Sequence, residues 1–355
     1  MYEKIFDAEL VAGELVDNVR AGTKAPLQDC IETTKLLLET LLSHSSDETL
    51  SAVHRALDTF SPDLENCFDA RLLTALGRSL GQWFDEKSEL SYSLSQEDDS
   101  HIEDMGIFAE IAAKTDPRIP ERVAAEDNFD FVLKLKALYV MDQSYKVRIG
   151  AIRLLNNLTA IIPAVRRCLV DTELPSVLAP LISDQRTSAE ERKMAVELLD
   201  QWAATGEPLP LVHLPFLNAN FFKALISLHE DRSALKLLIN LYASSPAETQ
   251  ELAMQALSDS KNGNLANHLL EYTNTTPTAA SFFLLSRLLS LPEEQVNDLF
   301  YHNDLSVAAT ISSRELLNSV DDKVQDYCLQ TLEALAKLGV RDYCMREALE
   351  GYHSF

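Results

Sequence analysis

The chain has 355 residues, 46% of them apolar, and carries a formal net charge of −24. Such an acidic protein is repelled by the phosphates of nucleic acids and by anionic lipid surfaces, so neither is an expected partner. The apolar fraction excludes wholesale disorder, and the scarcity of glycine and proline (10 and 13 residues) favours an all-α protein of long helices.

The first expected region, residues 1–128, is strongly acidic and helical. It holds 11 Lys/Arg against 27 Asp/Glu, a net charge of −16. Amphipathic patterns predict helices around residues 27–42, 49–60, 64–84 and 102–113. Residues 85–104, between the last two helices, are rich in Ser, Asp and Glu, which predicts a flexible acidic loop. We interpret the whole region as a helical cap on a repeat protein, because a terminal unit must present a polar outer face.

The second expected region, residues 129–355, is a series of armadillo-like repeats. Its first helical pattern, 146–161, places apolar residues at i, i+3/i+4 and i+7, and the same pattern returns four times. The aligned positions are Asn157, Gln201, Asn240, Arg287 and Ala334, spaced by 44, 39, 47 and 47 residues. This period is typical of armadillo and HEAT repeats, whose helices bury their apolar faces by stacking. The predicted fold is therefore an all-α armadillo/HEAT-like solenoid.

The repeated pattern A-x-x-L-L-x-N-L also resembles the last, groove-lining helix of an armadillo repeat. The resemblance implies that the asparagine position and the residue four before it face the concave groove. In this sequence the residues four before are Arg153, Glu197, Lys236, Phe283 and Gln330. The resulting partner-binding candidates are Arg153, Asn157, Lys236, Asn240 and Arg287.

Positive charge is concentrated next to this expected groove. Residues 129–170 carry seven Lys/Arg against two Asp, a net charge of +5. Three positive groove candidates on an acidic chain favour an acidic or mixed-charge helix or peptide as the bound partner. The alternative, that the candidates are only solvated positions on amphipathic helices, stays open.

No motif in the sequence indicates catalysis, a cofactor or a metal. The phosphate-binding loop, the dinucleotide-binding fingerprint, HExxH and GxSxG are all absent, and no two of the 8 histidines stand at i and i+4. His213 and His229 are expected to be hydrogen-bonded structural residues rather than ligands. Five scattered cysteines without CxxC indicate a reducing compartment, and no apolar stretch is long enough to span a membrane. We expect a cytoplasmic protein that is not an enzyme.

One segment near the C-terminal end is more specific than the repeat pattern. Residues 300–305 read Phe-Tyr-His-Asn-Asp-Leu, and Arg314-Glu315-Leu316 follow nine residues later. The segment resembles the C-terminal signature of the WISH/DIP family, which includes the Nck-interacting SH3 proteins and shorter fungal members. Two departures from the family pattern are His302, where threonine is expected, and Ser312-Ser313, which replace an apolar pair.

The resemblance implies a function. Members of this family bind and activate the actin-related protein 2/3 complex through an armadillo-like domain, and they need no preformed filament. They produce linear actin filaments that seed branched networks at endocytic, cortical actin patches. This chain resembles a short fungal member, for which actin is only an indirect partner. Tyr301, His302, Asn303 and Asp304 would be further partner-binding residues.

Two alternatives to this reading remain. The aromatic and apolar residues of the signature could pack a helix–loop junction, with Asn303 or Asp304 capping the following helix. The protein could also be a generic armadillo-type adaptor that binds a helix or peptide of another partner.

Overall fold

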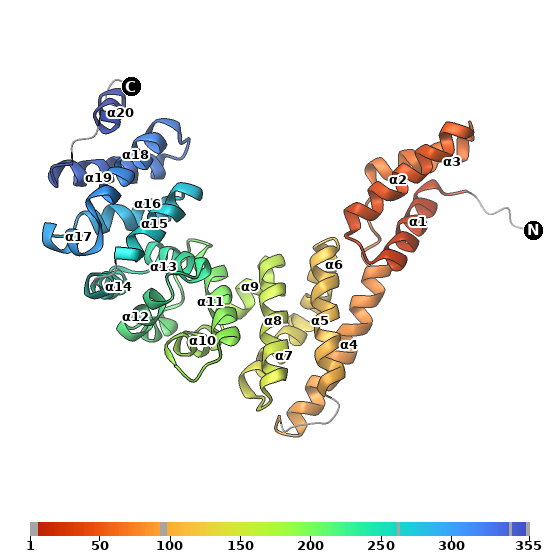
Figure 1. Ribbon diagram of the computed structural model, residues 1–355. Helices are drawn as coiled ribbons and strands as arrows, with labels where there is room; N and C mark the ends of the chain where they lie inside the picture. Colours follow the sequence, from red (N-terminus) through yellow and green to blue (C-terminus); the bar gives the residue numbers. More distant parts are fainter. Residues whose placement is uncertain (1–5, 93–97, 261–262, 341–342, 353–355) are drawn as a thin grey trace, which may run out of the picture. The chain divides into compact units, whose positions relative to one another are not determined.

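A computed structural model describes residues 6–92, 98–260, 263–340 and 343–352, and throughout these ranges the chain forms helices and no strands (Figure 1). The expected all-α class is therefore confirmed. No helix within the described ranges is both long and apolar enough to cross a membrane. Contacts divide the chain into two compact units, Met1–Leu169 and Val170–Phe355. The boundary predicted between residues 128 and 129 falls inside the first unit.

The first unit opens with three helices that have a small core of their own. Ala12, Val16, Cys30, Leu38, Val53 and Leu57 form this core. The helices of the unit are α1 (Ala8–Thr23), α2 (Leu27–His44), α3 (Glu48–Ala56), η1 (Leu57–Thr59), α4 (Phe68–Glu89), α5 (Asp98–Lys114), α6 (Arg118–Ala125), η2 (Glu126–Asn128), α7 (Asp130–Met141), α8 (Tyr145–Ile161) and α9 (Pro163–Val170), whose last residue belongs to the second unit.

A buried ion pair joins this small bundle to the long helix α4. The Arg20 Nε atom lies 3.0 Å from each carboxylate oxygen of Asp69, and both side chains are 3% exposed. Arg20 also donates to the backbone carbonyl of Ala25. The carboxylate of Asp17 accepts the backbone N–H of Phe68, the first residue of α4, at 2.9 Å. Together these bonds hold α1 against the beginning of α4.

The acidic stretch 85–104 is not the flexible loop that its composition predicts. Residues 85–89 complete α4 and residues 98–104 begin α5, while residues 93–97 lie outside the described part of the chain. The physical reason is pairing of charge. The Lys87 ammonium is 1% exposed and lies 3.0 Å from Asp98 and 2.9 Å from Asp142. Counting charges along the sequence could not show that these groups are paired and buried.

We expect Asp142→Ala to lower the free energy of unfolding by about 3 kcal/mol, because it leaves the buried Lys87 ammonium short of a carboxylate. Asp99→Ala is the control, since the 3.1 Å pair that it breaks with Lys146 is exposed. Its cost should stay below about 1 kcal/mol. Urea unfolding followed by far-UV circular dichroism compares the two variants. Equal losses would contradict a structural role for the buried lysine.

The second unit is a stack of helices in which each packs on near neighbours in the chain. Helix α11 packs on α13, α13 on α16, and α16 on α19. The helices are α10 (Leu174–Ser183), α11 (Ala189–Ala203), η3 (Leu211–Phe216), α12 (Ala219–Ser227), α13 (Arg232–Ser244), α14 (Ala247–Ser260), α15 (Gly263–Thr275), α16 (Ala279–Leu289), α17 (Glu293–Leu299), α18 (His302–Asn318), α19 (Asp322–Lys337) and α20 (Tyr343–Tyr352).

Buried apolar stripes hold this stack together. Leu198, Leu199 and Trp202 of α11 are at most 3% exposed. The stripe residues Leu237 and Leu241 of α13 are fully buried as well. These are the positions that the repeated sequence pattern places on the apolar face of each helix. The helical-repeat architecture expected from the sequence is thus confirmed.

Candidate functional site

Four of the five aligned repeat helices form one row in the second unit. They are α11, α13, α16 and α19, and each contacts the next. The aligned residues on this row are Gln201, Asn240, Arg287 and Ala334, of which Arg287 is exposed and Ala334 is only 4% exposed. Because Ala334 is buried, α19 contributes no exposed side chain at the aligned position. Its groove candidate is the exposed Gln330, four residues before.

Lys236 and Asn240, two of the predicted partner-binding residues, share one carboxylate of the preceding repeat. The Lys236 ammonium lies 2.7 Å from Asp200 Oδ2, and the Asn240 amide donates to Asp200 Oδ1 at 2.7 Å. The Asp200 side chain is 9% exposed and that of Lys236 is 45% exposed. The charge of Lys236 is therefore offset within the chain, although its side chain still reaches the surface. The sequence analysis missed Asp200, which precedes the aligned position by one residue.

Aromatic side chains continue this row toward α19. The rings of Tyr242 and Phe283 have centroids 5.4 Å apart, and those of Phe283 and Tyr327 are 4.9 Å apart. Burial raises the pKa of the Tyr242 phenol, and a hydrogen bond with Arg287 opposes this shift. Tyr242 and Arg287 also line a cavity of about 230 Å³. Tyr242 is only 2% exposed, so what the row offers a ligand is the half-buried rings of Phe283 and Tyr327, a small cavity and the exposed guanidinium of Arg287.

The other groove candidates, Arg153 and Asn157, lie on α8 in the first unit. Arg153 is exposed, whereas Asn157 is half-buried. Within the described residues, Asn157 Oδ1 is buried and has no hydrogen-bond partner. Their binding role stays a prediction.

The basic segment 129–170 is in part neutralised by the acidic stretch 85–104. Lys134 lies 2.8 Å from both Asp85 and Asp130, and Lys146 pairs with Asp99. The positive island and the acidic stretch, which looked like separate features in the sequence, are therefore electrostatic partners. This weakens the case for the island as a surface that attracts acidic proteins.

The signature segment at the start of α18 presents some residues and buries others. Tyr301 is 63% exposed, and His302 and Asn303 are exposed too. Asp304 is only 8% exposed, and its Oδ2 accepts the backbone N–H of Tyr301 at 2.8 Å. The capping role is thus confirmed for Asp304. A contact role for the other three residues stays a prediction.

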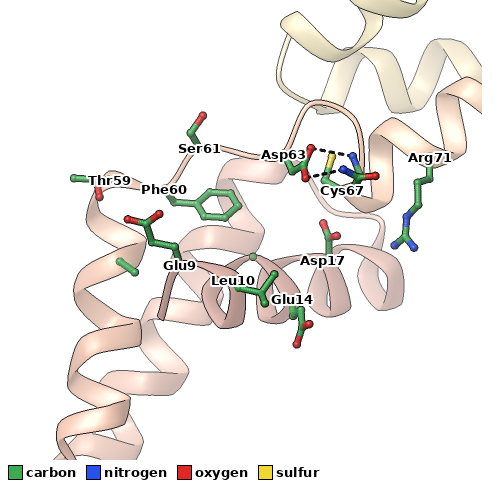
Figure 2. A pocket seen from close by; sticks show the side chains of 13 residues that line it. Glu9, Leu10, Glu14, Asp17, Thr59, Phe60, Ser61, Asp63, Cys67 and Arg71 are labelled. Atoms are coloured by element: carbon green, nitrogen blue, oxygen red, sulfur yellow. Dashed lines mark hydrogen bonds between the residues drawn. The ribbon is translucent and has the colours of Figure 1, made fainter. Parts of the chain in front are cut away.

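Figure 2 shows an acidic cavity in the first unit that the sequence analysis did not anticipate. It has a volume of about 530 Å³ and lies between α1 and the segment that leads into α4. The carboxylates of Glu9, Glu14, Asp17 and Asp63 line it beside the apolar side chains of Leu10 and Phe60. Burial raises the pKa of Asp17, and the hydrogen bond from the Phe68 N–H opposes the shift.

Helix α2 presents an apolar face to solvent in the same unit. Leu36, Leu37 and Leu41 are 63%, 55% and 53% exposed. They lie on one side of the helix, since Leu37 and Leu41 are four residues apart. Exposed apolar faces of this kind are typical of surfaces that contact other proteins.

The stacked helices and the surfaces they carry define an all-α helical-repeat protein. No family model matches the chain. Among solved structures, it is similar to an engineered protein at 18% identity, covering 73% of this chain and 97% of the other, with a TM-score of 0.45. It is similar to a designed armadillo repeat protein at 17% identity over 74% and 99% of the chains (TM-score 0.45). Another designed armadillo repeat protein, solved in complex with the peptide (KR)4, matches at 16% identity over 74% and 99% (TM-score 0.42).

We expect Lys236→Glu to lower the free energy of unfolding by about 2 kcal/mol, because it places a second carboxylate beside the buried one of Asp200. Arg287→Glu is the matched control on the next helix of the row. Its exposed side chain faces a phenol instead of a buried carboxylate, so its cost should remain under about 1 kcal/mol. Chemical denaturation of both variants makes the comparison. If Lys236→Glu leaves the free energy of unfolding unchanged, the Lys236–Asp200 pair does not stabilise the stack.

The acidic cavity yields a pH-dependent expectation for Asp17→Asn. Burial raises the pKa of Asp17 in the folded chain. Raising the pH from the unfolded-state pKa of about 3.9 through the folded-state pKa therefore lowers the free energy of unfolding of the wild-type protein. Asparagine keeps an oxygen to accept the Phe68 N–H and does not ionise. The thermal midpoint of Asp17→Asn relative to wild type should therefore be higher at neutral pH than at about pH 3. A difference that is constant with pH would contradict the burial of this carboxylate.

Proposed function

We propose that this chain is a non-enzymatic scaffold that binds and activates the actin-related protein 2/3 complex without a preformed filament. The observation that carries the proposal is the exposure of Tyr301, His302 and Asn303 at the start of α18. These residues belong to the segment that resembles the WISH/DIP signature, and their side chains are exposed instead of being buried in the core. Asp304 fixes the backbone beneath them through its bond to the Tyr301 N–H.

A second surface of the same unit supports a protein partner. On the row of α13, α16 and α19, the half-buried rings of Phe283 and Tyr327 lie near the exposed Arg287, with the buried Tyr242 packed against Phe283. Helix α18 packs on α19, and α19 on α16, so the two surfaces are held on connected helices. Aromatic and arginine side chains are the residue types that contribute most to protein–protein binding.

In the proposed mechanism, two surfaces of the second unit, the start of α18 and the row of α13, α16 and α19, bind a multi-subunit partner. A rigid scaffold activates a partner if it binds the active arrangement of subunits more tightly than the inactive one. Shifting the partner from almost fully inactive to almost fully active requires about 5.5 kcal/mol of differential binding. One contact alone rarely supplies that difference, whereas the α18 start and the aromatic row together could. The resulting filaments would be linear and would then seed branched networks.

The alternative is a generic armadillo-type adaptor that binds a helix or peptide of a different protein. The aromatic row favours this alternative equally, because nothing in its chemistry is specific to an actin nucleator. An activity assay separates the two functions.

Purified chain should accelerate pyrene-actin assembly by the actin-related protein 2/3 complex when no tailed activator and no seed filament are present. Microscopy should show unbranched products. Tyr301→Ala/Asn303→Ala should lower the acceleration about tenfold, which corresponds to a loss of about 1.4 kcal/mol in binding. Asn318→Ala, at the opposite end of α18, is the control and should behave as wild type.

Each outcome of this experiment has a distinct meaning. No acceleration by the wild-type chain would reject the activator function and leave the adaptor. Acceleration that the double variant retains in full would reject the α18 start as a contact and direct attention to the aromatic row.

A further inference from the structure

A small cavity in the second unit brings together two histidines that the surfaces above do not use. It has a volume of about 220 Å³. His229 reaches it from the turn between α12 and α13, and His268 reaches it from α15. Their ring centroids are 5.2 Å apart and the ring planes are inclined by 44°. Glu230 and Glu271, both exposed, line the same cavity.

The tautomer of His229 follows from the hydrogen bond that its ring makes. Its Nδ1 atom lies 3.0 Å from the backbone carbonyl oxygen of Ile226. A carbonyl oxygen only accepts, so Nδ1 carries the proton and donates it. In the neutral imidazole, Nε2 then holds a lone pair that is free to accept a hydrogen bond or to bind a metal.

That lone pair is buried and unused. His229 is 8% exposed, and across the described ranges its Nε2 atom has no hydrogen-bond partner. Leaving a buried acceptor without a partner costs about 1–3 kcal/mol, so such an atom requires an explanation. The Nδ1 atom of His268 is also buried and without a hydrogen-bond partner among the described residues. Two residues that line the cavity thus each hold an imidazole nitrogen without a hydrogen-bond partner in the described part of the chain.

We propose that His229 and His268 bind a borderline-soft divalent cation such as Zn²⁺ in this cavity. Imidazole nitrogen is a preferred ligand of such ions at metal–nitrogen distances of about 2.0–2.1 Å. Two imidazoles on a tetrahedral ion at that distance have ring centroids about 5 Å apart, which agrees with the observed spacing. The bond from His229 Nδ1 to a backbone carbonyl is also the usual way in which a protein orients a metal-binding histidine.

The remaining coordination positions do not come from a preformed cluster. No group of three or more His, Cys, Asp or Glu side chains among the described residues is placed to hold a metal. The site is therefore a two-histidine site whose other ligands are water or a donor from a partner. The nearby carboxylates of Glu230 and Glu271 add attraction for a cation. Arg232 also lines the cavity, where its guanidinium lies over the Tyr272 ring and donates to Thr276 at 3.0 Å, so its positive charge opposes the attraction of the two carboxylates.

A bound ion would connect two separate elements. His229 lies in the turn three residues before α13, whereas His268 belongs to α15, and these helices contact each other. A metal held by both histidines is a cross-link present only in the folded chain. Metal binding should therefore raise the thermal midpoint of the protein.

The test is calorimetric titration of the reduced, chelator-treated full chain with ZnCl₂, paired with Co²⁺ absorption spectra. We expect saturable binding at one site and a Co²⁺ spectrum without a sulfur-to-metal charge-transfer band, which excludes the cysteine thiols as ligands. His229→Ala and His268→Ala should each weaken Zn²⁺ binding by about tenfold or more. His302→Ala removes an exposed histidine of the same unit and should leave the affinity unchanged.

The proposal is overturned if the wild-type chain shows no saturable binding, or if the two cavity variants bind Zn²⁺ as tightly as His302→Ala. Because His229 is buried, its alanine variant is checked by circular dichroism. If that variant unfolds, His268→Gln decides the matter, since it is half-buried and preserves side-chain size. A midpoint that ZnCl₂ raises equally in His268→Gln and in wild type would place the ion elsewhere.

Discussion

The architecture depends on one constraint: an amphipathic helix of this chain cannot bury its apolar face without its neighbours. In the second unit, α13 covers part of α11 and is in turn covered by α16. Leu237 and Leu241 of α13 are fully buried within this stack. Stability of such a stack is close to a sum of nearest-neighbour interfaces. The outer surface of the row is then free to vary, and it is there that Arg287, Phe283 and Gln330 are found.

Electrostatics in this acidic chain is mostly local pairing between repeats or between neighbouring elements. Lys87 is held by two carboxylates, and Lys236 shares Asp200 with an asparagine. Lys134 is likewise held by Asp85 and Asp130. Net charge therefore says little about which cations are available to a protein partner. Exposed fractions and bond partners decide that, and they favour Arg287 over Lys236.

The sequence predicted what is local and missed what depends on distant pairing. Helix α8 was expected at 146–161 and is found at Tyr145–Ile161, because an apolar stripe of one helix is visible in one window. The acidic stretch was misjudged because its pairing depends on the fold: Lys87 pairs with Asp98 inside the stretch and with Asp142 outside it. Histidines were searched only at helical spacing, yet His229 and His268 are 39 residues apart, one repeat period. The Asp200–Lys236 pair is separated by 36 residues, also close to one repeat. A comparison of residues about one repeat apart, for pairs of histidines and for pairs of opposite charge, would have indicated both the His229–His268 pair and the Asp200–Lys236 pair.

The small core of α1–α3 has a consequence for motion and folding. These helices bury Val16, Leu38 and Val53 among themselves, and Arg20 with Asp69 is their main polar attachment to α4. The Asp17 carboxylate adds a second attachment through the Phe68 N–H. A segment with its own interior and few polar attachments is a candidate foldon, a unit that opens cooperatively. Opening of this segment exposes the beginning of α4, including the carboxylate of Asp69, to solvent.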